Sequence, residues 1–113
     1  MKAIETKLKG CFILDPTVFK DPRGYFFESY NKQKLEENGL FYDFVQDNQA
    51  RSSYGVLRGL HYQLAPFAQA KLVRVVEGTV LDVAVDLRKG SPTFGQSFGV
   101  ILSAENKKQL LVI

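Results

Sequence analysis

The sequence has no tryptophan and only one cysteine and one histidine among its 113 residues. A single cysteine cannot form an internal disulfide, and the apolar neighbours of Cys11 predict a small buried side chain. One histidine without clustered acidic ligands excludes a His-rich metal centre built by this chain alone. A glycine-rich phosphate-cradling motif is also missing.

Long hydrophobic runs are missing as well. No segment approaches the roughly 20 apolar residues of a membrane span, and the N-terminal residues lack an apolar stretch of signal-peptide length. We therefore expect a cytoplasmic chain with no membrane partner. At 45% hydrophobic and 24% charged residues, the composition is typical of one globular domain over residues 1–113.

Positive charge is present but dispersed. Fifteen Lys and Arg against twelve Asp and Glu give a net charge of +3, and no basic run exceeds Lys107-Lys108. Nucleic-acid-binding proteins concentrate such charge in a patch or stripe, so no nucleic-acid partner is expected. Single arginines among aromatic and polar residues favour a small anionic ligand.

Short apolar runs separated by turn residues predict an antiparallel sandwich or barrel. Asp21–Gly24 is typical of a turn, because proline favours its second position and glycine its last. Asn31–Asn38 predicts one short helix, with Asn31 as its cap and Gly39 at its end. The expected strands are Cys11–Leu14, Gly24–Ser29, Phe44–Asn48, Gly55–Gln63, Gln69–Val76, Thr79–Leu87, Gln96–Ser103 and Lys107–Ile113.

The last residues, Gln109–Ile113, form an apolar run with no polar exit. An exposed apolar strand edge invites aggregation. We therefore expect a chain cut short within its domain. The alternative is an edge strand that docks on a partner subunit.

His61 lies in the strand expected at Gly55–Gln63. A lone histidine in a strand is more often structural than catalytic, although its pKa suits proton transfer. Gly59 shares the face of His61 and leaves room for a group to approach the backbone. Arg58 points to the opposite face, so a bulge near Gly59 is required if Arg58 and His61 serve one site.

Lys71 alternates with Val73 and Val75. It is either a buried cation that needs a partner or an edge-strand lysine that deters aggregation, and the residues leave both open. Asp82 and Asp86 share a strand face about 13 Å apart. That separation is too large for an acid–base pair, so we interpret both as surface or structural carboxylates.

Two other polar groups are candidates for ligand binding. Gln46 and Asn48 point the same way at a strand end, either as paired amides or as part of an Asx-type turn. Arg23 and Glu28 flank the aromatic run Tyr25–Phe27. An arginine beside aromatic rings can hold a phosphate while a base stacks; the alternative is an aromatic core strand between solvated charges.

Seven segments occur together in a recognisable order. They are Asp21–Ser29, Phe44–Asn48, Val56–Gln63, Lys71–Arg74, Asp82–Arg88, Ser91–Gly95 and Leu102–Asn106. With these segments in register, essentially the whole chain closely resembles the dTDP-4-dehydrorhamnose 3,5-epimerase family.

The resemblance implies an all-β cupin double-stranded β-helix (jelly roll), incomplete at the C-terminus, with one short helix. It also implies a homodimer that needs no metal or other cofactor. The implied reaction inverts C3 and C5 of dTDP-4-dehydro-6-deoxy-D-glucose in dTDP-L-rhamnose biosynthesis. Both carbons lie next to the C4 ketone, so a base can remove an acidified proton and an acid can return one to the other face.

The same resemblance implies roles for individual residues. His61 is the base, Lys71 stabilises the enolate oxygen, and Arg58 holds the substrate near its sugar and phosphates. The matching nucleotide- and sugar-binding positions are Arg23, Glu28, Gln46 and Asn48, with Phe19 and Phe26 assigned to thymine stacking.

The family's acid tyrosine, and the aspartate that orients the catalytic histidine, belong to a part of the pattern beyond Ile113. We therefore expect the 113-residue chain alone to be inactive or nearly so. The alternatives are an enzyme that inverts only C3, a cupin ketoisomerase, and a chain that binds dTDP-sugars without catalysis.

Overall fold

The computed structural model describes residues 1–59 and 70–112. Strands dominate this part of the chain and one short helix accompanies them, which confirms the expected all-β class. The elements are β1 (Lys2–Glu5), β2 (Phe12–Asp15), β3 (Val18–Asp21), β4 (Gly24–Phe27), α1 (Lys32–Glu37), β5 (Lys71–Arg74), β6 (Thr79–Val85), β7 (Ser97–Ser103) and β8 (Gln109–Val112).

Four strands form an antiparallel sheet in the order β1-β2-β8-β5. β8 lies between β2 and β5, and its Leu111 pairs with Phe12 on one side and Leu72 on the other. The apolar end of the described chain is therefore a central strand. The alternative interpretation of this segment as an edge strand is wrong.

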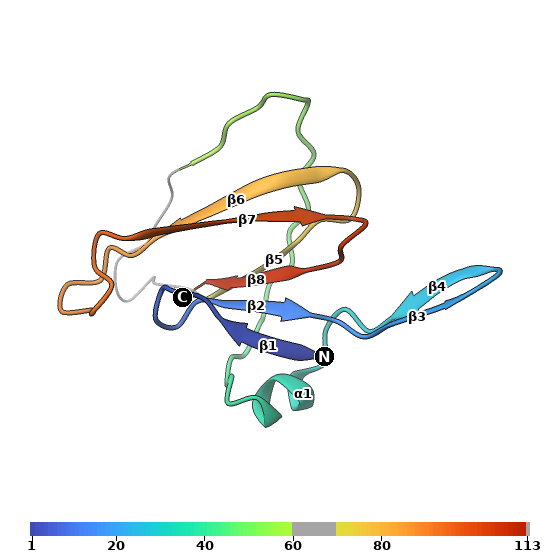
Figure 1. Ribbon diagram of the computed structural model, residues 1–113, viewed down its shortest axis with the longest axis horizontal. Coiled ribbons are helices and arrows are strands. Elements are labelled where there is room, and N and C mark those ends of the chain that lie inside the picture. The colour runs from blue at the N-terminus through green and yellow to red at the C-terminus, as the bar shows by residue number, and fades with distance from the viewer. Residues whose placement is uncertain (60–69, 113) are drawn as a thin grey trace.

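β8 is buried on both faces because its two successive leucines, Leu110 and Leu111, lie in two different cores. Leu110 packs in a cluster with Leu102 of β7, whereas Leu111 packs with Leu14 of β2 and Leu35 of α1. Successive side chains of a strand point to opposite faces, so the sheet has a core on each side. Figure 1 shows β6 and β7 on one side of the sheet and α1 on the other.

β6 and β7 form a two-stranded ribbon paired from Thr79 with Ser103 to Val85 with Ser97. Its inward face buries Ala84 and Leu102 against the sheet. Its outward face carries Leu81, which is 68% exposed, and Ile101, which is 57% exposed. The predicted alternation in β6 is confirmed, but its larger apolar side chains face solvent.

The β6–β7 connection is fixed by a buried carboxylate. Asp86 is 4% exposed and accepts hydrogen bonds from Arg88 Nε at 3.0 Å, from Ser91 Oγ at 2.6 Å and from the Thr93 hydroxyl. Arg88 also donates to the carbonyl of Lys9 in the β1–β2 connection. Asp86 is therefore a structural carboxylate, one of the two interpretations left by the sequence.

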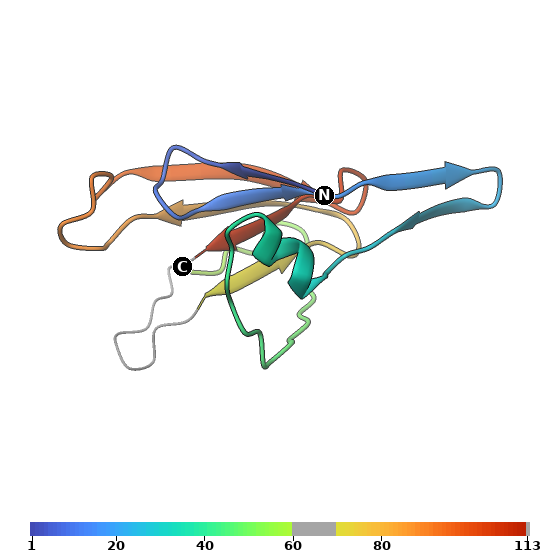
Figure 2. The same cartoon turned by 90° about the horizontal axis from the view of Figure 1, so that it is seen from below.

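The β3–β4 hairpin projects away from the four-stranded sheet (Figure 1) and pairs with no other described strand. Its turn forms as the sequence predicts. Asp21 Oδ1 accepts from the Arg23 backbone N–H at 2.8 Å, and Gly24 has a φ of 143°, which only glycine adopts readily. The hairpin ends close to α1, which begins after the expected cap Asn31 (Figure 2).

α1 has six residues, and no helix within residues 1–59 and 70–112 is long and apolar enough to cross a membrane. Its N-cap is confirmed, because Asn31 Oδ1 accepts from the Lys34 N–H at 3.1 Å. The helix buries only Leu35. Its place on the sheet therefore depends mainly on that one side chain.

Two strands expected from the sequence do not form as predicted. Phe44–Asn48 is irregular, and so is the described part of the expected strand Gly55–Gln63, whose residues 60–63 lie outside the described part. A strand requires partners for its backbone N–H and C=O groups. No described strand pairs with residues 41–59. β1 and β3, in contrast, were not expected.

Candidate functional site

The β3–β4 hairpin brings four of the candidate residues together. Register pairing places Phe19 opposite Phe26, and both rings are well exposed, at 62% and 69%. Arg23 occupies the turn at one end of this pair. Glu28 follows β4 at the other end. The hairpin therefore presents two adjacent rings between a cation and an anion.

Two shallow cavities adjoin these rings, and Phe19 and Phe26 line both. One has a volume of about 230 Å³ and lies between the hairpin and the start of α1. The other, of about 270 Å³, lies toward the turn and includes Arg23. The first cavity is lined by Met1, Thr17, Phe19, Phe26, Glu28, Tyr30, Asn31 and Lys34.

The charged groups of the hairpin are held by local partners. Glu28 accepts from Asn31 Nδ2 at 3.2 Å and forms an ion pair with Lys34 at 2.9 Å; the Lys34 contact, followed by the Asn31 bond, lowers the pKa of Glu28. Asp21 Oδ2 lies 2.8 Å from Arg23 Nη2, and this bond lowers the pKa of Asp21 and raises that of Arg23. Both carboxylates are ionised at neutral pH.

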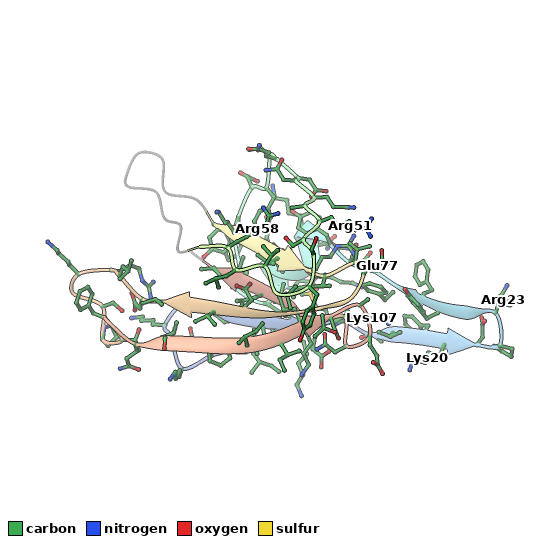
Figure 3. All side chains as sticks on the ribbon, turned by 90° about the horizontal axis from the view of Figure 1, so that it is seen from above. Lys20, Arg23, Arg51, Arg58, Glu77 and Lys107 are labelled. Atoms are coloured by element: carbon green, nitrogen blue, oxygen red, sulfur yellow. The ribbon has the colours of Figure 1, made fainter. Side chains whose placement is uncertain are left out.

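A second group of candidates lies in the irregular segment 41–59. Gln46 Nε2 is 3.5 Å from Asn48 Oδ1, at the limit of a hydrogen bond. Arg58 Nε donates to Ser52 Oγ at 2.8 Å and its Nη2 to the Arg51 carbonyl at 3.3 Å. Arg58 thus folds back on its own segment. Figure 3 shows Arg51 and Arg58 over the body of the molecule, away from the hairpin turn that carries Arg23.

The two expected catalytic residues are placed differently. Lys71 is the first residue of β5, which is an edge strand of the four-stranded sheet, and its side chain is exposed. His61 lies outside the described residues.

The structure does not bring all candidates to one place. Arg23 lies at the far end of the hairpin and Arg58 lies on the other part of the molecule (Figure 3). Tyr30 and Lys34 also line the cavity beside α1, and neither was expected there from the sequence. Lys34 follows the cap Asn31 by one helical turn, and that spacing was the available signal.

No cluster of three or more His, Cys, Asp or Glu side chains able to hold a metal ion occurs within residues 1–59 and 70–112. Asp82 faces inward from β6, and desolvation raises its pKa. It lies in the β6–β7 strand pair, opposite Val100.

Comparison with known proteins places these features in context. A sequence model described as dTDP-4-dehydrorhamnose 3,5-epimerase matches residues 5–113. The dTDP-4-dehydrorhamnose 3,5-epimerase of Shigella flexneri is 58% identical over 113 residues, which are 99% of this chain and 62% of that protein. The chain thus spans less than two thirds of the length of this curated relative.

Solved structures agree with this match. The epimerase of the same description from Elizabethkingia anophelis NUHP1 superposes with a TM-score of 0.94 at 60% identity, covering 100% of this chain and 62% of that one. A dTDP-6-deoxy-D-glucose-3,5-epimerase from Legionella pneumophila, in complex with dTDP-4-keto-L-rhamnose, gives 0.91 at 52% identity, covering 98% and 59%. These superpositions confirm the expected cupin-type fold.

Proposed function

Because this chain belongs to the dTDP-4-dehydrorhamnose 3,5-epimerase family, we propose that it is part of an epimerase acting on dTDP-4-dehydro-6-deoxy-D-glucose. The match over residues 5–113 is the observation that carries this proposal. The reaction removes the proton at both C3 and C5, each next to the C4 ketone, and returns a proton to the opposite face of each carbon. Residues 1–113 then form the N-terminal two-thirds of a single cupin domain.

In this proposal the hairpin holds the nucleotide. Phe19 and Phe26 offer adjacent exposed rings on which thymine can stack. The Arg23 guanidinium, whose side chain is 91% exposed, is available for the diphosphate. Glu28 stays ionised through Lys34 and Asn31 and accepts hydrogen bonds from donor groups of the ligand.

The remaining candidates act on the sugar. His61 is the proposed base, and Lys71 is the proposed cation at the developing enolate oxygen. A fixed positive charge at that oxygen stabilises the transition state more than the ground state. Arg58 holds the substrate between its sugar and phosphates, and Gln46 and Asn48 supply amide contacts.

The separation of these groups supports the proposed homodimer. The hairpin projects from the sheet, and Arg23 at its turn lies far from Arg58 on the body of the molecule (Figure 3). A second copy that receives the hairpin beside its own Lys71 would complete one site from two chains. Sedimentation at micromolar concentration tests this arrangement, and a monomer that still binds dTDP contradicts it. The cytoplasmic location stays a prediction, tested by cell fractionation.

Binding of dTDP to the 113-residue chain tests the nucleotide site. Phe26→Leu removes one stacking ring and is expected to weaken binding by about 1–3 kcal/mol. Phe94→Leu is the matched control, because Phe94 is 54% exposed and lies in the β6–β7 connection, away from the hairpin. Equal affinities of the two variants in calorimetric titration would contradict the hairpin site.

Deuterium exchange tests the chemistry. The chain is incubated with dTDP-4-dehydro-6-deoxy-D-glucose in D₂O, and C3 and C5 are followed by NMR. Exchange at both carbons supports the 3,5-epimerase. Exchange at C3 alone supports the alternative C3-specific enzyme. dTDP binding without exchange agrees with the expectation that residues 1–113 alone are inactive or nearly so, and it equally fits a non-catalytic binding chain.

A further inference from the structure

Lys107 has a backbone conformation that lysine rarely adopts. Its φ is 57°, and it is the non-glycine residue with positive φ within residues 1–59 and 70–112. In this region Cβ approaches the neighbouring carbonyl, so glycine or asparagine is usual. Such an outlier persists only where its surroundings hold it, and it points to a specific role for the side chain.

The ammonium group of Lys107 makes three contacts. It donates to the carbonyl oxygens of Ala104 at 3.0 Å and Glu105 at 3.2 Å, within the β7–β8 connection. It also lies 4.1 Å from the centroid of the Tyr25 ring in β4, within the range of a cation–π interaction. The two carbonyls fix the cation to the body of the protein, and the ring belongs to the hairpin.

Lys107 contacts the hairpin on the face opposite the Phe19 and Phe26 rings. Side chains alternate along a strand, so Tyr25 points away from the face that carries Phe26 and its cross-strand partner Phe19. Tyr25 is backed by Phe27, with ring centroids 6.0 Å apart. The cation therefore supports the surface opposite the two exposed rings.

The hairpin has few other ties to the sheet. Its strands pair only with each other among the described strands. At its base, Gln109 Nε2 of β8 donates to the Ser29 carbonyl at 2.6 Å, and the Met1 amino group donates to Thr17 Oγ1 at 3.2 Å. These bonds fix the base of the hairpin, whereas the contact with Tyr25 lies closer to its turn.

We infer that Lys107 is a positioning residue for nucleotide binding: its ammonium, anchored by the β7–β8 connection, holds the Tyr25 side of the hairpin so that Phe19 and Phe26 keep the orientation that a base requires. This inference rests on the proposed function of the hairpin. Lys107 itself does not touch the ligand. Its effect is transmitted through Tyr25.

Lys107→Gly separates this role from a general structural one. Glycine suits a φ of 57°, so the thermal midpoint is expected to be unchanged or higher. The loss of the cation is expected to weaken dTDP binding about three- to tenfold. Lys107→Arg keeps a cation over the ring and restores affinity. Lys108→Met is the control for loss of one positive charge.

Tyr25 provides the second arm of the experiment. Tyr25→Leu is expected to weaken dTDP binding to the same extent as Lys107→Gly, and the double variant to show no further loss, because both changes break one contact. Wild-type affinity in Lys107→Gly, or additive losses in the double variant, would overturn the inference.

An NMR readout that needs no ligand distinguishes this inference from the proposed function. The ε-methylene protons of Lys107 should be shifted upfield by the Tyr25 ring, and Tyr25→Leu should abolish the shift. If the wild-type chain binds no dTDP, the nucleotide site is wrong; the hairpin contact then stands if the shift is present. Absence of the shift in the wild-type chain overturns the inference in every case.

Discussion

The two faces of the β6–β7 ribbon allow a paired test of what covers them. Leu102 is fully buried and packs in the cluster that contains Ala84 and Leu110. Leu102→Ala is expected to lower the free energy of unfolding by about 2–5 kcal/mol, from lost transfer energy and the cavity left behind. Leu81, on the opposite face of the same ribbon, is 68% exposed.

Leu81→Ala makes the same chemical change on the open face. Full burial of a leucine is worth about 1.5–3 kcal/mol, so a side chain that is about one third buried should contribute roughly 0.5–1 kcal/mol. Urea unfolding followed by circular dichroism gives both values, provided that the m-value stays constant. Equal costs for Leu81→Ala and Leu102→Ala would contradict this prediction, because the outward face would then be covered in solution.

Three other predictions follow from local contacts. The hydrogen bond from Arg88, followed by those from Ser91 and Thr93, lowers the pKa of Asp86. The ionised Asp86 therefore stabilises the fold fully above the ordinary aspartate pKa of about 3.9, and this stabilisation is lost progressively as the pH falls below that value. Asp86→Asn should lower the thermal midpoint at pH 7 and make that midpoint less dependent on acid pH. Asn31→Ala should cost about 1 kcal/mol in urea unfolding, because the cap of α1 is lost. Burial raises the pKa of Cys11, so its reaction with a disulfide reagent at pH 8 should be slow until urea is added.

Features set by a few neighbouring residues were predictable from the sequence. The Asp21–Gly24 turn and the Asn31 cap depend on side chains that bond to backbone groups two or three positions away. The alternation of β6 was equally clear, and its pairing with β7 extends over the whole strand. In each case the signal and the structure lie in the same short segment.

Pairing between distant segments was not predictable in this way. β1 forms because Lys2–Glu5 meets β2, and nothing in its own four residues requires a strand. Phe44–Asn48 has a favourable composition but no described partner, and Val45 is 93% exposed. β-propensity reports packing on a sheet more than an intrinsic backbone preference. Composition alone therefore missed β1 and β3 and predicted a strand at Phe44–Asn48 that does not form.

The candidate site also has one part set by neighbouring residues and another set by contacts between distant segments. A turn at Asp21–Gly24 places Phe19 opposite Phe26 once β3 pairs with β4. The turn was predicted from the local residues, whereas β3 itself was not expected. The distance between Arg23 and Arg58 depends on the angle at which the β3–β4 hairpin projects from the four-stranded sheet. The sequence carries no local signal for that angle. Lys107 was overlooked for the same reason, because its partner Tyr25 is remote in sequence.

The Asp21–Arg23 pair bears on whether the hairpin can hold an anion at all. The arginine is already hydrogen-bonded to a carboxylate at 2.8 Å, yet the two side chains are 91% and 46% exposed. Exposed ion pairs contribute little and exchange readily with other partners, whereas a diphosphate offers more charge and more acceptor oxygens than one carboxylate. The guanidinium has five N–H donors, so it can keep Asp21 and still bind phosphate oxygens. Asp21 therefore orients Arg23 at the turn without blocking it.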